Sequence, residues 1–223
     1  MQIFKALDFI SSYIQLLPLT LLLIYRPFNA QLKALFLYCF ISAAIEVFIT
    51  FIPDMNVVSH FTLMNSYTIL ETLIIYYIYY REFKFERSRF MIILNLVFIL
   101  VAIGNYSNKQ YSDITSGAEG LTIIALAIIY FYRISGDLSI PKLTNYYFFW
   151  INASFLFYFS ITSLFFLAVN YIRFLTGMEY KYLWALNHIT NILYNILLSI
   201  GIIKARQLRE QPKQVLSSES GLS

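Results

Sequence analysis

The chain has 223 residues, of which 59% are hydrophobic and only 13% are charged. A soluble domain usually carries about 25% charged residues, so roughly half of the expected water-facing charge is missing. This composition excludes an ordinary soluble domain and predicts an integral membrane protein. The single cysteine, Cys39, excludes an internal disulfide. The net charge of +4 is compatible with either nucleic acid or lipid headgroups, so the positions of the basic residues decide between these partners.

Seven apolar runs follow one another along the chain, each with about the 17–25 residues that a membrane-spanning helix needs. The predicted spans are Phe9–Tyr25, Leu32–Ile52, Val57–Tyr80, Phe90–Tyr106, Thr115–Ile134, Tyr146–Asn170 and Tyr182–Lys204. Short polar connections separate them. The sequence therefore predicts an all-α polytopic membrane bundle of about seven transmembrane helices. We expect one transmembrane domain, residues 1–204, followed by a short basic cytoplasmic tail, residues 205–223, that frays.

The basic residues are unevenly distributed between the two sides that seven spans define. One side holds Lys5, Lys109, Arg173 and Lys181, whereas the other holds the remaining twelve of the 16 Lys and Arg residues. Basic residues mark the cytoplasmic face of a membrane protein. We therefore expect the N-terminus outside and the C-terminus inside. The excess positive charge is interpreted as contact with lipid headgroups, and no nucleic-acid partner is expected.

Ionisable and amide side chains inside the spans are the candidate functional residues, because such groups are costly at membrane depth. The helical rise of about 1.5 Å per residue places one group within roughly 10 Å of the outer surface and a second group about 12–21 Å deep. The outer group is Glu46, His60, Glu119, Asn187 and His188. The deeper group is Asn65, Asn191, Asn195 and Glu71. These nine residues form the predicted ligand-binding or proton site.

Helical periodicity places several of these residues on common faces. On the last predicted span His188, Asn191 and Asn195 share one stripe, and on the third His60 and Glu71 share another. Because lipid cannot satisfy polar groups, we expect the stripes to face one another inside the bundle. The alternative is that the amides only hold helices together.

Glu71 is the strongest single candidate, because it lies about 21 Å from the outer end of its span. The Lys and Arg residues within the predicted spans lie at their inner edges. A carboxyl group at such depth must be protonated, hydrogen-bonded or paired. We expect it to be largely protonated at neutral pH, with Asn65, Asn191 and Asn195 as available hydrogen-bond partners. The alternative is that Glu71 merely bridges helices.

Three segments stand out for their combination of amide, acidic and aromatic residues: Asn65-Ser-Tyr-Thr-Ile-Leu-Glu71, Phe149-Trp-Ile-Asn152 and His188-Ile-Thr-Asn191-Ile-Leu-Tyr-Asn195-Ile-Leu-Leu. They resemble small uncharacterised bacterial seven-helix inner-membrane proteins, some of which are encoded beside sensor histidine kinases. The resemblance implies a multi-pass protein of the bacterial inner (cytoplasmic) membrane with a sensory role. It implies no substrate and no catalytic residue.

Three classes of function remain open at this point. A receptor-like or signalling accessory protein would use a polar intramembrane pocket open toward the outer face, with an unidentified small-molecule ligand and a membrane signalling partner. A small-solute or proton-coupled transporter would use Glu71. A membrane-embedded metal-dependent hydrolase is third, because the two histidines fall short of the three used by seven-helix hydrolases of the ceramidase and progestin-receptor-like type. No cofactor and no catalytic residue is expected, and metal binding is left open.

Overall fold

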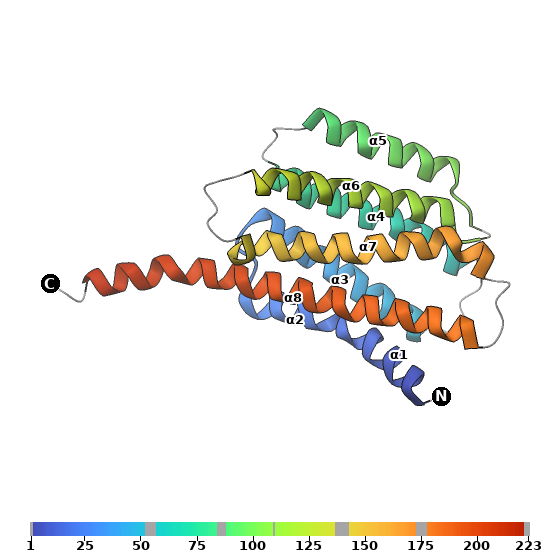
Figure 1. The fold of residues 1–223 in the computed structure, drawn as a ribbon, viewed down its shortest axis with the longest axis horizontal. Helices are drawn as coiled ribbons and strands as arrows, with labels where there is room; N and C mark the ends of the chain where they lie inside the picture. The colour runs from blue at the N-terminus through green and yellow to red at the C-terminus, as the bar shows by residue number, and fades with distance from the viewer. Residues whose placement is uncertain are drawn as a thin grey trace.

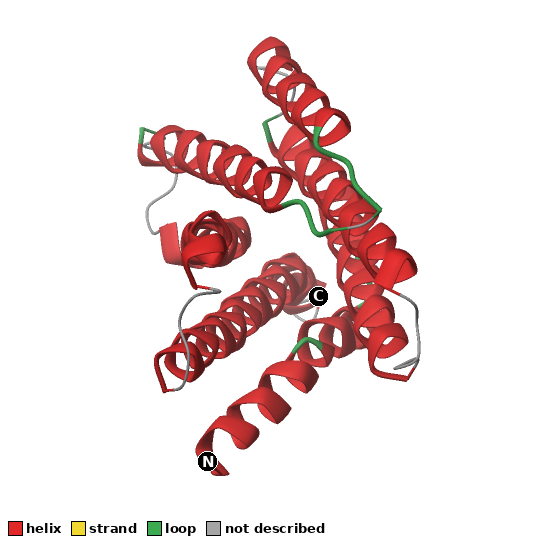
Figure 2. Ribbon diagram, turned by 90° about the vertical axis from the view of Figure 1, so that its right-hand side faces the viewer, coloured by secondary structure: helices red, strands yellow, loops and turns green. Residues whose placement is uncertain are grey.

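The computed structural model describes residues 2–51, 57–83, 88–108, 110–136, 143–172 and 178–220. In these residues every regular element is helical, which confirms the predicted all-α fold (Figure 2). The α-helices are α1 (Gln2–Ile14), α2 (Leu16–Tyr25), α3 (Ala30–Phe51), α4 (Val57–Glu82), α5 (Ser88–Gly104), α6 (Asp113–Ser135), α7 (Tyr147–Ile172) and α8 (Met178–Ser220). A short 3-10 helix, η1 (Leu143–Asn145), precedes α7.

The helices lie side by side with their long axes nearly parallel (Figure 1). α1 and α2 follow one another in the same direction, and each later α-helix returns antiparallel to the one before it. Sequential pairs pack together, most extensively α6 with α7 and α7 with α8. α8 also packs against α1 and α2, so the two ends of the chain close the bundle. α5 lies at the edge, where it contacts α6 and α4.

Five helical segments in the described residues are long and apolar enough to cross a membrane. They are Ile3–Tyr25, Ala30–Ile49, Asp113–Ser135, Tyr147–Phe165 and Lys181–Arg209. Large apolar side chains point outward from several of them, including Leu23, Leu37 and Leu164. Outward-facing apolar side chains on long apolar helices are what a bilayer requires. The protein is therefore a helical membrane protein.

α4 and α5 coincide with the third and fourth predicted spans but are not among these five segments. α4 has 26 residues, yet its inward face carries polar groups such as His60, Asn65 and Glu71, which lower its mean hydropathy. α5 has 17 residues, which corresponds to about 25 Å of helix, shorter than the roughly 30 Å hydrocarbon core. The remaining five predicted spans match the five segments.

The first predicted span differs from the structure in two ways. Its helix begins at Gln2 rather than Phe9, and it is interrupted at Gln15, between α1 and α2. Pro18 explains the interruption, because it has no N–H to donate to the carbonyl of Ile14. The Gln15 amide compensates locally by donating to the carbonyl of Ser12 at 3.2 Å. Its Oε1 accepts from Oγ of Ser42 on α3 at 3.4 Å, so the side chain turns into the bundle.

The last helix continues beyond the predicted domain boundary at residue 204. Ala205 is buried against the bundle, and α8 then extends away from the other helices to Ser220 (Figure 1). Fraying of the tail stays a prediction. Several positions used in the sequence analysis lie outside the described residues: Ile52, Lys84, Arg87, Lys109, Lys142, Arg173 and residues 221–223.

The apolar core fills the half of the bundle that lies toward the end of α2. Leu35 of α3, Ile75 of α4, Phe155 of α7 and Leu198 of α8 are each at most 1% exposed. These side chains form a continuous apolar cluster with their neighbours. The other half of the bundle, toward the start of α1 and α8, contains a cavity.

Candidate functional site

A cavity of about 470 Å³ occupies the half of the bundle where α1 and α8 begin. Its walls come from α1, α3, α4 and α8, with side chains added by α7 and by the loop between α5 and α6. Small-molecule sites typically measure about 300–1,000 Å³. Seven of the nine predicted site residues line it: Glu46, His60, Glu71, Asn187, His188, Asn191 and Asn195.

The polar stripes face the cavity, as their spacing predicts. On α8 the lining includes Asn187, His188, Asn191 and Asn195, whose positions recur on one face of a helix. On α4 it includes His60, Met64, Tyr67 and Glu71. Both stripes therefore turn inward and line the same cavity. Their role in ligand binding stays a prediction.

Glu71 lies at the floor of the cavity and is held by tyrosine hydroxyls. The hydroxyl of Tyr38 on α3 donates to Glu71 Oε1 at 2.9 Å, and Tyr194 on α8 donates to the Tyr38 hydroxyl at 2.8 Å. Tyr67, one turn away on α4, also hydrogen-bonds the carboxyl group. The expectation that amides would hold Glu71 is therefore wrong. A chain of hydroxyls joins three helices at this carboxyl.

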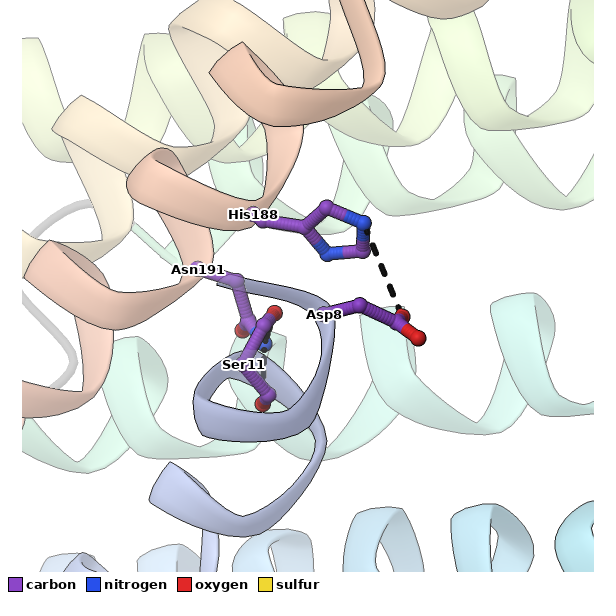
Figure 3. Close-up of polar contacts among 4 residues, drawn as sticks. All are labelled: Asp8, Ser11, His188 and Asn191. Carbon is purple, nitrogen blue, oxygen red and sulfur yellow. Dashed lines mark hydrogen bonds and ion pairs between the residues drawn. The ribbon is translucent and has the colours of Figure 1, made fainter. Parts of the chain in front are cut away.

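The amides on α8 instead bind α1 and each other. Asn191 Nδ2 donates to both the carbonyl and the Oγ of Ser11, each at 3.0 Å. Asn195 Nδ2 in turn donates to Oδ1 of Asn191 at 3.0 Å. One turn above, His188 Nε2 lies 3.7 Å from Asp8 Oδ1 (Figure 3). These contacts fasten α1 to α8 and so build one wall of the cavity.

Asn65 is not among the cavity-lining residues. Its Nδ2 donates to the carbonyls of Ser107 and Gln110 at 2.6 and 3.0 Å, and its Oδ1 accepts from the N–H of Ser112 at 3.0 Å. Every polar atom of this amide is therefore used to hold the loop between α5 and α6. The same loop carries Tyr111, which does line the cavity. Asn65 thus shapes the cavity wall indirectly.

Glu119 lies behind the wall rather than on it. Its side chain is buried, and its Oε1 accepts from Oγ1 of Thr72 on α4 at 2.9 Å. Thr72 directly follows Glu71, and the two carboxyl groups are close enough for their charges to repel each other. The site therefore contains a second buried acid that faces α4 but not the cavity.

The cavity combines acidic groups with an unusual number of aromatic rings. The carboxyl groups belong to Asp8, Glu46 and Glu71, and two imidazoles accompany them. The aromatic lining is Tyr38, Phe61, Tyr67, Tyr111, Tyr158, Phe165, Trp184 and Tyr194. Among the described residues that line it there is no Lys and no Arg. The charged side chains of the described lining are therefore acidic ones, accompanied by the two histidines.

Several of these groups were missed by the sequence analysis, although a signal for two of them exists. Tyr194 falls three positions after Asn191, and Tyr38 falls four positions before Ser42, which also lines the cavity. Helical spacing from these polar residues could therefore have placed both tyrosines on the inward faces. Asp8 and Tyr111 carry no such signal. Asp8 precedes the predicted start of its span, and Tyr111 lies in a loop whose path depends on Asn65.

The described residues contain no group of three or more His, Cys, Asp or Glu side chains placed to hold a metal ion. His60 and His188 line the same cavity but do not converge with carboxylates in such a set. Comparison with protein-family models, curated proteins and solved structures gives no match. The functional inference therefore depends on the chemistry of the cavity.

Proposed function

We propose that this protein is a seven-span, receptor-like or signalling membrane protein whose cavity binds a small organic cation from the outer side. One observation carries the proposal. The cavity of about 470 Å³ is lined by three carboxyl groups and eight aromatic rings, with no Lys or Arg among its described lining residues.

A positively charged amine or quaternary ammonium suits this lining for two physical reasons. Carboxyl groups in a recessed, low-dielectric site attract cations and repel anions. The faces of aromatic rings also attract cations, by about 0.5–2 kcal/mol each, and aromatic cages are a recurrent means of binding quaternary ammonium groups. Asp8, with its side chain 68% exposed, is placed at the mouth to attract such a ligand, and Glu71 at the floor to hold it.

The proposed orientation rests on the basic residues. Arg26, Arg81, Arg133 and Arg206 lie at or beyond the ends of α2, α4, α6 and the membrane segment of α8, opposite the cavity. With the positive-inside rule, this supports a cavity that opens outward and a C-terminus inside. Seven spans, with α4 and α5 included, give the odd number that this orientation requires. On the resemblance noted above, we also propose that the protein lies in a bacterial inner membrane and that its signalling partner is a sensor histidine kinase.

The shape of the bundle supports sensing over transport. Beyond Glu71 the next turns of α4 carry Ile75 and Ile78, both at most 1% exposed, so an apolar layer separates the cavity from the other end. α8 runs unbroken from the cavity wall to Ser220. A ligand that shifts the outer half of α8 would therefore displace its cytoplasmic end, where a signalling partner could respond.

A transporter is the second candidate, and the buried Glu71 with its hydroxyl chain favours it. Such a protein would need to open the apolar layer below Glu71 during each cycle. Uptake of a radiolabelled ammonium compound into vesicles, with and without a pH gradient, separates the two roles. The metal-dependent hydrolase is the least favoured reading, since the described residues hold no metal-binding group.

The proposal can be tested with the cavity's own tryptophan. The chain has two tryptophans, and Trp184 lines the cavity whereas Trp150 donates to the carbonyl of Thr144 outside it. In a Trp150→Phe background, choline should change the fluorescence of Trp184 saturably. The neutral isostere 3,3-dimethylbutan-1-ol should have no such effect.

Two variants separate a specific site from general binding. Glu71→Gln should weaken choline binding by about tenfold or more, because it removes the carboxylate charge and keeps the shape. Glu82→Gln changes an acid of the same helix outside the cavity lining and should have no effect. Equal responses to choline and its neutral isostere would reject the proposed ligand class.

A further inference from the structure

A second pocket lies at the opposite end of the bundle from the cavity, between the α2–α3 turn and α8. Its volume is about 270 Å³, and its lining combines Arg26, Arg206 and Arg209 with apolar and aromatic side chains. Among the described residues that line it there is no carboxylate. Three guanidinium groups around one recess are the side chains best suited to a phosphate group.

Aromatic rings position two of the guanidinium groups. The guanidinium carbon of Arg206 lies 4.6 Å from the centre of the Tyr25 ring, and that of Arg209 lies 5.6 Å from the centre of the Phe28 ring. Such stacking limits the freedom of a long side chain. The pocket thus presents guanidinium groups in fixed positions.

The third arginine stands at a turn where its backbone is unusual. Arg26 has φ +52°, and its N–H donates to the carbonyl of Leu22 at 3.0 Å. Residues with a side chain rarely adopt positive φ, and the following Pro27 keeps Arg26 out of the helical conformation. A glycine would satisfy this turn more easily. An arginine, and therefore a positive charge, stands here although the backbone conformation favours glycine.

The surroundings of the pocket are those of the bilayer edge. Ile24, which lines it, is 65% exposed, and its neighbour Leu23 is 59% exposed. Both lie on α2, within a segment that can cross the membrane. A ligand there would meet apolar surface on one side and arginine on the other. This is the arrangement of a phospholipid with its headgroup in the pocket and its acyl chains beside α2.

We propose that this pocket binds the phosphate group of an anionic phospholipid, with Arg26, Arg206 and Arg209 as its donors. Basic pockets between transmembrane helices at the cytoplasmic side recognise anionic headgroups in this way. The ligand would link the α2–α3 turn to the inner part of α8. The proposal is independent of the ligand in the outer cavity.

The test uses the full chain in nanodiscs that contain phosphatidylcholine with or without phosphatidylglycerol. After release into mild detergent, native mass spectrometry measures the lipid that stays bound. The wild-type protein should retain one phosphatidylglycerol in preference to phosphatidylcholine. The double variant Arg206→Gln, Arg209→Gln should lose this preference by about tenfold or more. Equal retention of the two lipids by the wild-type protein would overturn the proposal.

Three controls make the result specific. Arg81→Gln removes an exposed arginine at the same end but outside the pocket, and it should leave retention unchanged. Arg206→Lys with Arg209→Lys keeps the charge but loses the planar fork, so retention should be intermediate. Glycerol phosphate should not displace the lipid. An equal loss in Arg81→Gln, or displacement by glycerol phosphate, would overturn the lipid site.

Discussion

Glu71 and the tyrosine hydroxyls at the floor of the cavity determine how the cavity would respond to a charged ligand. Glu71 accepts from Tyr38, and Tyr38 accepts from Tyr194, so one carboxyl group is coupled to side chains on α3 and α8. Hydroxyl donors stabilise the carboxylate form by hydrogen bonding, whereas burial in an apolar bundle favours the neutral form. The balance between these effects can be shifted by a cation, which binds only the charged form well.

We expect choline to bind more tightly as the pH rises. A cation favours the carboxylate of Glu71, and higher pH increases the fraction of that form, so the affinity should increase between about pH 5 and 8. In Glu71→Gln this pH dependence should be largely lost, because Gln keeps the shape but cannot titrate. Fluorescence titration of Trp184 at several pH values measures it.

Other titratable groups face the same site and could also make choline binding depend on pH. The contribution of Glu71 is therefore measured by comparing variants. The groups that interact with Glu71 are Tyr38, Tyr67, Tyr111, Glu119, Tyr158 and Tyr194. Asp8, Glu46, His60 and His188 line the cavity nearer its mouth. Glu82→Gln serves as the matched control, because it changes an acid of the same helix as Glu71 that does not line the cavity. An unchanged pH profile in Glu71→Gln would show that Glu71 only bridges helices.

The helices differ in how they are held together, and the difference follows from their side chains. α6 and α7 approach so closely that a Cβ on Gly120 would overlap Cβ of Ser163 and lie 3.3 Å from the carbonyl of Phe159. Small residues allow such contact between membrane helices. α1, in contrast, is fastened to α8 through polar groups at Asn191 and His188. The first contact is made by close packing, whereas the second is made by hydrogen bonds and charged groups that line the cavity.

Gly120→Ala should destabilise the protein, because the added methyl group has no space between α6 and α7. The expected cost is about 1–3 kcal/mol, as for other overpacked contacts. Gly104→Ala is the matched control, since a Cβ there meets no atom within 4 Å. That variant should be neutral or slightly stabilising. Thermal unfolding in detergent compares the two, and equal midpoints would contradict the close contact.

Asn191→Ala should loosen α1 without unfolding the bundle. The substitution removes both hydrogen bonds to Ser11 and the acceptor Oδ1 that Asn195 uses. Hydrogen exchange should therefore increase in residues 3–14, while α6 and α7 stay protected. Asn105→Ala is the control, because its amide donates only within its own helix end, to Val101. Increased exchange throughout the bundle would instead indicate global destabilisation.

The two pockets at opposite ends of the bundle differ in the charge of their linings. Acidic groups line the cavity at the end where α1 begins, and arginines line the pocket at the other end. This arrangement suits a membrane whose cytoplasmic leaflet carries the anionic lipids. The proposed ligand site and the proposed lipid site therefore lie at opposite ends of the bundle.

A reporter fused after Ser223 should be active only on the cytoplasmic side. The physical reason is the concentration of twelve of the 16 basic residues at that end of the seven predicted spans. A second reporter fused before Met1 should be active only outside. Activity of both fusions on the same side would mean an even number of spans and would exclude the proposed orientation.

The sequence by itself determined the class of the protein and the direction of its polar stripes. Apolar runs of about 20 residues can only be helices in a bilayer, because every backbone group must be satisfied within the segment. Helical spacing then placed His60 and Glu71, and His188 with Asn191, on common inward faces. Both conclusions depend on local geometry alone, and the structure agrees with them.

Tertiary structure alone decided which partner each polar group takes. The sequence suggested amides beside Glu71, but tyrosine hydroxyls hold it, while Asn65 holds a loop and Asn191 holds α1. It also placed Glu119 at the site, although that carboxyl lies behind Thr72. These pairings join residues on different helices. They depend on the rotation and depth of each helix against its neighbours, which packing sets and which no spacing within one helix can specify.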